Sequence, residues 1–313
     1  MFFEKGRTIV WLLLAFAVAG GAATSDIFFS QKRLDAFSPL AKAWAARAGT
    51  IPLLACFVAV QGVPAIAAPF WMFVTINAAL DALASFFFMR ALALAPISQT
   101  MPIMALTPAF MIATTPLLTN DTVTSLGLVG VGVVSLGVYA TQHPGRDTAS
   151  GAVGGFWSPI AAVVRNPGAR AMFFAAALFA VTRALDRPCI EASSGSWYLL
   201  VEHALLAAIL GGAIVIRRIV KRESGATALQ SAKSAAPLLV LGGSVNAVAF
   251  LLHVWALGFM SVPYLIAVKR TSIILSSMWG YLVRKERAPH WYHIMGVALA
   301  IFGVALIALY GKK

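Results

Sequence analysis

Two adjacent cations, Lys269 and Arg270, lie inside an apolar stretch at residues 262–283. They stand about eight residues from its start, roughly 12 Å along a helix. If the stretch crosses a membrane, both cations cannot face lipid without a penalty, because neighbouring helix positions point about 100° apart. A guanidinium fork beside an ammonium group suits a phosphate or a carboxylate. The pair predicts a buried anion site; the alternative is an internal ion pair with Asp81 or Glu202.

Asp81 is a second candidate, because it stands at the middle of the apolar stretch 70–92. Asn77, Asp81 and Ser85 recur at every fourth position, which places them on one face of a helix. An acid at membrane depth is costly unless it faces a cavity or a partner. We expect Asp81 to contact substrate or to carry a proton. The alternative is a hydrogen bond between helices, worth about 1 kcal/mol.

Asn246 holds the matching central place in the stretch 235–257, and His253 lies on the same face. For Asn246, a cavity and a hydrogen bond between helices are both open. A lone histidine is by default a satisfied core residue, and His253 is a candidate only through its face. Three further side chains are expected at the substrate site: Thr107, Tyr264 and Ser272. Tyr264 could equally anchor its helix at the membrane interface.

Prolines interrupt the stretch 97–118, where Pro102 and Pro108 each remove a backbone hydrogen bond and bend a helix. Bent helices line transport sites and can rock, but proline is also common in membrane helices. Gating at Pro102 and Pro108 is therefore one of two open interpretations. Four glycines in the stretches 123–140 and 291–310 predict close helix packing: Gly130, Gly137, Gly296 and Gly303.

Other ionisable residues also lie within apolar stretches. Five stand close enough to the ends to reach the membrane surface: Asp26, Lys42, Arg90, Arg183 and Asp186. Arg47 and Glu202 lie about a third of the way in, where an interfacial role and a buried role are equally open. His203, like His253, is by default a core histidine.

The composition indicates which elements position these residues. Of 313 residues, 60% are hydrophobic and 11% are charged, whereas a soluble domain is about a quarter charged. This excludes a soluble enzyme, a disordered protein and a secreted disulfide scaffold. The net charge of +13 comes mostly from short links, which is typical of membrane topology and not of a nucleic-acid partner. The two cysteines lack CxxC spacing, so we expect no metal site and no cofactor.

Ten apolar runs match the roughly 30 Å hydrocarbon core of a bilayer. They predict an all-α membrane protein with ten transmembrane helices. The runs cover residues 9–29, 40–60, 70–92, 97–118, 123–140, 169–186, 196–216, 235–257, 262–283 and 291–310. Lys and Arg are more frequent in links after odd-numbered runs, and this bias places both termini outside the cytoplasm.

The chain contains two similar halves. Residues 81–92 align without gaps on residues 246–257, and Asp81 meets Asn246. Two long links are predicted, at 143–165 and 217–233. The predicted organisation is a five-helix repeat at 1–141, a connecting link at 142–168 and a second five-helix repeat at 169–313. Because five is odd, the copies enter the membrane from opposite sides, as inverted repeats that bracket a midplane site in transporters.

Several segments carry a family resemblance: ALALAP, PISQTMPIMALTPAF, AVKRTSIILSSMWGYLVRKE and GVALAIFGVALIAL. Over essentially the whole chain, the sequence resembles the EamA branch of the drug/metabolite transporter superfamily. The segment AVKRTSIILSS also resembles plastid phosphate translocators, in which a Lys-Arg pair grips the substrate phosphate, and this implies that role for Lys269 and Arg270. Members usually carry Gly-Glu after the fourth and ninth helices, where this chain has ND at 120–121 and KE at 285–286. The family usually has cytoplasmic termini, against the charge bias.

We therefore expect an integral transporter in the cell (inner) membrane that moves a small organic anion, bound at Lys269 and Arg270, by alternating access. One alternative is export of a neutral or cationic metabolite at Asp81, and another is a lipid-handling or non-transport membrane subunit. HExxH, a Ser/His set and a GxxxxGK[ST] P-loop are absent from the sequence, so we expect neither an enzyme nor an ATP-driven pump. The expected partners are a small-molecule substrate, the lipid bilayer and a co-transported or exchanged ion such as a proton.

Overall fold

The computed structural model describes residues 2–29, 37–95, 97–119, 121, 123–141, 158–221, 225–275, 278–279 and 291–311. The regular structure of these residues is helical. The helices are α1 (Phe2–Phe29), α2 (Pro39–Ala48), α3 (Ile51–Gln61), α4 (Phe70–Leu94), α5 (Ile97–Met104), α6 (Thr107–Leu118), α7 (Ser125–Thr141), α8 (Ser158–Arg165), α9 (Pro167–Glu191), α10 (Gly195–Lys221), α11 (Gly225–Leu257), α12 (Val262–Arg270) and α14 (Trp291–Tyr310).

Six helical segments in the described residues are long and apolar enough to cross a membrane: Leu40–Gln61, Phe70–Leu94, Pro167–Glu191, Gly195–Val220, Val240–Leu257 and Trp291–Tyr310. Shorter apolar helices lie at Val10–Ser25, Pro102–Leu118 and Ser125–Thr141. Large apolar side chains are exposed on many of these helices, among them Leu13, Trp255 and Phe302. Such an apolar surface suits lipid and not water. The chain is therefore a multi-pass membrane protein of the helical class. The ninth predicted span, 262–283, lies partly outside the described residues.

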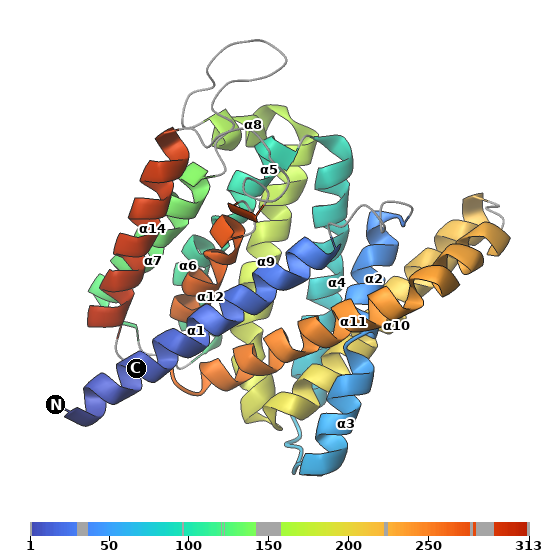
Figure 1. Cartoon of the computed structure of the whole chain (residues 1–313), viewed down its shortest axis with the longest axis horizontal. Coiled ribbons are helices and arrows are strands. Elements are labelled where there is room, and N and C mark those ends of the chain that lie inside the picture. The colour runs from blue at the N-terminus through green and yellow to red at the C-terminus, as the bar shows by residue number, and fades with distance from the viewer. Residues whose placement is uncertain are drawn as a thin grey trace.

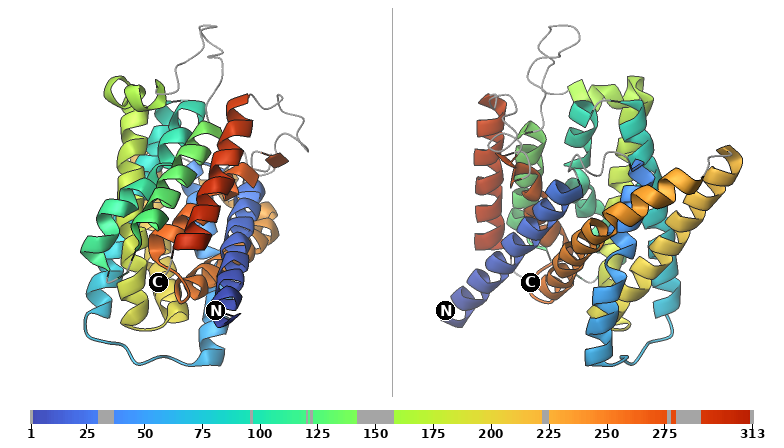
Figure 2. Two further views of the ribbon diagram at one scale, coloured as in Figure 1. Left: turned by 90° about the vertical axis from the view of Figure 1, so that its left-hand side faces the viewer. Right: turned by 45° about the vertical axis from the view of Figure 1, so that its right-hand side comes forward.

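The helices pack as long pairs around a shared interior. α4 packs along α9, α7 packs along α14, and α1 packs against α11. Figure 1 shows α4, α7, α9 and α14 running upright, while α1 and α11 cross them obliquely. The two further views keep this arrangement and show α12 beside α7 and α1 (Figure 2). Most of the buried ionic side chains described below come from α2, α4, α9 and α10.

Glycines bring α7 and α14 into backbone contact, as the sequence predicts. A Cβ atom added to Gly137 would lie 2.5 Å from the backbone nitrogen of Ala300. A Cβ atom on Gly296 would lie 2.5 Å from the carbonyl oxygen of Gly137. A Cβ atom on Gly130 would lie 2.9 Å from the carbonyl oxygen of Gly303, and one on Gly303 would lie 2.8 Å from the carbonyl oxygen of Gly130. Larger residues cannot occupy these positions, so the prediction of close packing is confirmed.

Parts of the two predicted links are helical. Residues Ser158–Arg165 of the first link form helix α8. In the second link, α10 continues to Lys221 and α11 begins at Gly225. The predicted links at 143–165 and 217–233 are thus helical in these described parts. The reason is that loss of apolar character ends a membrane span but does not end a helix, because Lys, Arg, Ala and Gln all have high helix propensity.

The fourth predicted span is divided into two helices, α5 and α6. Pro108 has no backbone N–H, so the carbonyl oxygen of Met104 lacks its donor four residues later. The Thr107 hydroxyl donates to that oxygen instead, at 2.7 Å. Ala105 and Leu106 form the turn between the helices, whereas Pro102 lies inside α5. The break is thus local to Pro108, and its use in gating stays a prediction.

Candidate functional site

Arg183 of α9 lies at the centre of a buried ionic cluster. Its Nη2 contacts Oδ2 of Asp81 in α4 and lies 3.6 Å from Oε1 of Glu202 in α10. Its Nη1 lies 3.2 Å from Oδ2 of Asp186 in α9 itself. The side chains of Asp81 and Glu202 are fully buried. Charges buried in this way are tolerated only when they compensate each other, so Arg183 joins α4, α9 and α10.

Arg183 and Asp186 do not reach the membrane surface, so the prediction that they do is wrong. Arg183 is 8% exposed and Asp186 is 1% exposed. The apolar run ends at residue 186, but α9 continues to Glu191 and carries both side chains inside the bundle. The sequence did carry a signal for this ion pair: Arg183 and Asp186 are three residues apart, which places them on one face of the helix.

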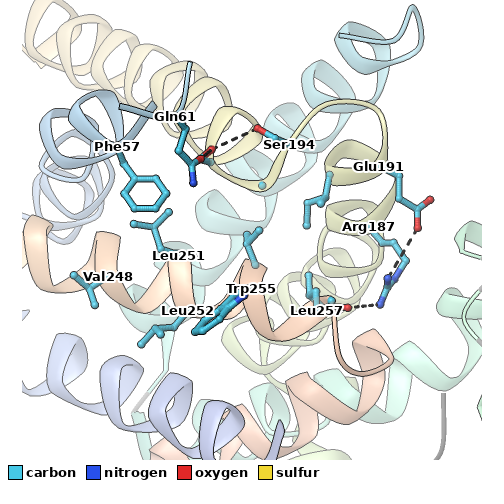
Figure 3. Close-up of a pocket in the computed structure, with 15 residues that line it drawn as sticks. Phe57, Gln61, Arg187, Glu191, Ser194, Val248, Leu251, Leu252, Trp255 and Leu257 are labelled. Atoms are coloured by element: carbon cyan, nitrogen blue, oxygen red, sulfur yellow. Dashed lines mark hydrogen bonds and ion pairs between the residues drawn. The ribbon is translucent and has the colours of Figure 1, made fainter. Parts of the chain in front are cut away.

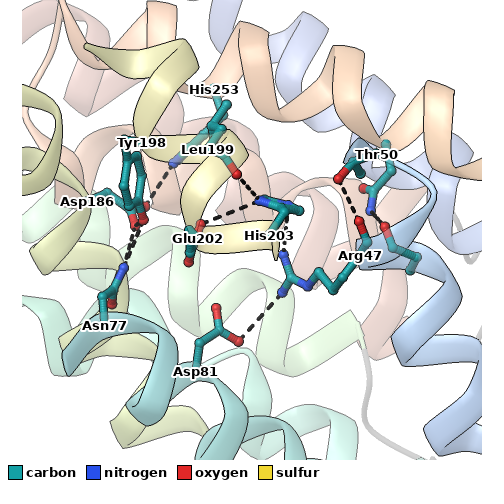
Figure 4. Close-up of polar contacts among 12 residues, drawn as sticks. Arg47, Thr50, Asn77, Asp81, Asp186, Tyr198, Leu199, Glu202, His203 and His253 are labelled. Atoms are coloured by element: carbon teal, nitrogen blue, oxygen red, sulfur yellow. Dashed lines mark hydrogen bonds and ion pairs between the residues drawn. The ribbon is translucent and has the colours of Figure 1, made fainter. Parts of the chain in front are cut away.

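Asp186 is held by hydrogen bonds from three other helices, α4, α10 and α11 (Figure 4). The Tyr198 hydroxyl donates to Oδ1 of Asp186 at 2.6 Å. The Nδ2 of Asn77 donates to the Tyr198 hydroxyl at 2.8 Å and to Oδ1 of Asp186 at 3.4 Å. The Nε2 of His253 lies 3.3 Å from Oδ2 of Asp186. The structure thus brings the predicted site residues Asn77 and His253 to the same acid, which the sequence did not single out as a partner.

Arg47 of α2 joins the cluster from the opposite side. Its Nη2 lies 3.6 Å from Oδ1 of Asp81, and its Nη1 lies 3.3 Å from Nε2 of His203. The Nδ1 of His203 lies 2.9 Å from the carbonyl oxygen of Leu199. Since a guanidinium can only donate, Nε2 accepts and Nδ1 carries the hydrogen, which makes His203 neutral. Ser85 also donates to Oδ1 of Asp81 at 3.4 Å.

Lys269 and Arg47 approach the same aromatic ring. The Cζ of Arg47 lies 5.1 Å from the ring centroid of Phe250, and the Nζ of Lys269 lies 5.3 Å from it. An aromatic face attracts cations at this distance. Among the described residues, no carboxylate forms an ion pair with Lys269. Asp81 and Glu202, the partners considered from the sequence, are instead paired with arginines.

The exposure of α12 changes abruptly at the two cations. Every side chain from Ser261 to Val268 is buried, and so are Thr271 and Ser272. Lys269 and Arg270 between them are partly exposed. Because Asp81, Asp186 and Glu202 are at most 1% exposed, the accessible part of the cluster is cationic. This arrangement favours an anionic ligand.

Arg270 is positioned by the break between α5 and α6. Its Nη2 donates to the Thr107 hydroxyl at 3.0 Å, and that hydroxyl in turn donates to Met104. Lys269 and Arg270 also form the last turn of α12, where the helix dipole favours positive charge. Two predicted site residues, Arg270 and Thr107, are therefore in contact. Ser272 is buried just past the end of α12.

Asn246 and Tyr264 act between helices. The Nδ2 of Asn246 donates to the Ala46 carbonyl oxygen at 3.0 Å, and Ser25 donates to its Oδ1 at 3.3 Å. These contacts fit the hydrogen-bonding alternative for Asn246. Tyr264 is 1% exposed, and its hydroxyl accepts from the Thr124 backbone nitrogen at 2.8 Å. That burial does not fit an interfacial anchor.

A second ionic contact lies near the C-terminal end of α9. The Nε of Arg187 lies 2.7 Å from Oδ1 of Asp121, and its Nη2 donates to the carbonyl oxygens of Leu257 and Met260 at 2.9 and 2.8 Å. The Oδ2 of Asp121 accepts from the Val262 backbone nitrogen at 2.8 Å. Arg187 thus joins α9 to the link before α7 and to the turn between α11 and α12.

An apolar pocket of about 740 Å³ lies between α3, α11 and the turn from α9 to α10 (Figure 3). Phe57, Leu251 and Trp255 form its apolar wall, and Gln61 and Arg187 lie at its margin. Residues of the ionic cluster do not line it within the described chain. The pocket and the cationic site are therefore separate features.

No protein-family model matches this sequence, and no curated protein is similar to it. A solved structure with the bare description "Crystal structure of protein" is similar over 96% of this chain and 97% of its own, with a TM-score of 0.68 and 17% identity. At this identity the similarity concerns the fold alone. The helical arrangement described above therefore has a counterpart of nearly the same length among solved proteins.

Proposed function

We propose that this chain is an EamA-type membrane transporter that moves a small organic anion by alternating access. Lys269 carries the proposal: it is partly exposed on a buried helix and has no carboxylate partner among the described residues. A cation at membrane depth that contacts no carboxylate is costly, and a bound anion would supply the missing contact. Arg47, which shares the Phe250 ring with Lys269, is the second proposed anion contact.

Reciprocal helix packing supports the proposed inverted repeat. The third span packs on the sixth (α4 with α9), and the eighth packs on the first (α11 with α1). The fifth and tenth spans, α7 and α14, pack on each other. The fourth span is interrupted at Leu106 and the ninth span at Thr271. These two breaks are separated by the same number of residues as Asp81 and Asn246, the pair that meets when the two halves are aligned. Interrupted helices border substrate sites in alternating-access transporters.

The contacts of Asp81 argue against a cationic substrate there. Both of its carboxylate oxygens already face guanidinium groups, from Arg183 and Arg47. A cationic metabolite would have to displace one of these arginines, which would leave a buried guanidinium uncompensated. The anion site at Lys269 requires no such displacement.

Ligand-dependent thermal stability tests the proposal. The purified chain in detergent would be heated with inorganic phosphate, sugar phosphates, carboxylates, amino acids and organic cations. A ligand at a hundredfold excess over its Kd stabilises a protein by about 2.7 kcal/mol. We expect an anion to stabilise the wild-type chain and Lys42→Met but not Lys269→Met. Stabilisation by a cation that disappears in Asp81→Asn and persists in Lys269→Met would contradict the proposal.

A further inference from the structure

Glu202 is buried without the contacts that a carboxylate needs. Its side chain is fully buried, and neither oxygen has a hydrogen-bond partner among the described residues. Arg183 lies 3.6 Å from Oε1 but is shared with Asp81 and Asp186. His203 lies 3.7 Å from Oε2, but its Nδ1 hydrogen is directed to a carbonyl oxygen. A buried charge in this position is costly, whereas a carboxyl group that has taken up a proton carries no charge.

The helices around α10 bring charges of both signs to Glu202. Arg47 comes from α2, Asp81 from α4, and Arg183 and Asp186 from α9. α3 brings no acidic or basic residue. Further titratable groups in the described chain are the buried Cys189 of α9, His253 of α11, which faces Asp186, and Tyr198 and His203 of α10 itself.

Within this cluster the charges do not cancel. Three carboxylates, Asp81, Asp186 and Glu202, face two guanidinium groups, Arg47 and Arg183. Lys269 is the next cation and shares the Phe250 ring with Arg47, whereas the guanidinium of Arg270 donates to Thr107 of α6. With Lys269 free of ligand, its charge balances the third carboxylate. An anion bound to Lys269 removes that balance, and one negative charge is then in excess.

We propose that Glu202 binds a proton whenever an anion occupies Lys269, so that the two are transported together. This rests on the proposed function. A proton from water on the entry side forms an O–H bond with a carboxylate oxygen of Glu202 as a singly charged anion binds to Lys269. The bond breaks and the proton returns to water on the exit side as the anion leaves. Because linkage is reciprocal, the proton also strengthens anion binding.

Removing the charge of Lys269 imitates anion binding and allows a test without substrate. Full-length chain labelled with 13C-glutamate would be placed in lipid nanodiscs and titrated with acid by infrared spectroscopy. The carbonyl band of a protonated glutamic acid belongs to Glu202 if it is lost in Glu202→Gln and retained in Glu191→Gln, since Glu191 is exposed. In Lys269→Met, we expect half-protonation at about a tenfold lower proton concentration than in wild type, a change of roughly 1.4 kcal/mol, because the carboxylate form loses a nearby positive charge. Lys42→Met should titrate like wild type.

A glutamic acid band that survives in Glu202→Gln, or a titration unchanged by Lys269→Met, would overturn this proposal. Should Glu202→Gln fail to fold, labelling of wild type decides, because the band must shift with 13C-glutamate and not with 13C-aspartate. A shift with 13C-aspartate alone would place the proton on an aspartate and overturn the proposal. The infrared titration needs no substrate. A negative infrared result therefore does not affect the thermal-stability test of anion binding. If instead no anion stabilises the chain, the protonation of Glu202 can still be measured.

Discussion

Replacing Arg183 with methionine tests whether the ionic cluster holds the helices together. Methionine keeps much of the side-chain length but removes the guanidinium that contacts Asp81, Asp186 and Glu202. Breaking a single buried ion pair costs about 3–5 kcal/mol, because the remaining charge stays buried. Here three carboxylates lose their common partner, and Arg47 stays near only one of them. We therefore expect a loss at the upper end of that range.

The loss can be measured as the temperature at which the detergent-solubilised chain stops eluting as a single species. A change of this size lowers Tm on the order of 10 °C. Arg170→Met is a matched control, because Arg170 lies exposed on the same helix. Adding Asp81→Asn to Arg183→Met should recover part of the loss, since one uncompensated charge is removed. Equal melting of Arg183→Met and Arg170→Met would refute the stabilising role of the cluster.

Three further outcomes follow from the contacts. Gly137→Val should lower Tm because the larger side chain disrupts the α7–α14 packing. Gly132→Val should leave Tm unchanged, because a Cβ atom at Gly132 meets open space. Equal Tm values for the two variants would count against that packing. Arg187→Met should lower Tm because Asp121 and two carbonyl oxygens lose their donor, while Glu191→Gln should have little effect because that side chain is 64% exposed. Phe250→Leu should weaken anion binding about two- to fivefold in a ligand titration, because both cations lose the ring, and an unchanged Kd would exclude that contribution.

Local rules were sufficient for the all-helical class and for the glycine packing. A run of about twenty apolar residues has to satisfy its own backbone, so the helices follow from composition. The paired positions of Gly137 and Gly296 likewise predicted the close approach of α7 and α14. The apolar runs did not locate the helices formed by more polar sequence, as in α8 and at the end of α10.

The partners inside the bundle were beyond sequence reasoning. Asp81 attracted notice because an acid at mid-span is costly, but its partner Arg183 lies 102 positions away. No local pattern joins residues at that separation. Arg47 and Glu202 were left undecided for the same reason. Phe250 was missed because an aromatic residue in an apolar helix ordinarily faces lipid or core, and only tertiary packing brings two cations to its ring.

Uptake into proteoliposomes tests anion transport through Lys269 most directly. Vesicles containing the purified chain would be given the radiolabelled anion that best stabilises it in the thermal screen. We expect saturable uptake by the wild-type chain and by Lys42→Met, and uptake at the level of empty vesicles for Lys269→Met. Equal uptake by Lys269→Met and wild type, with both proteins folded, would contradict the assignment of Lys269 as the anion-binding residue.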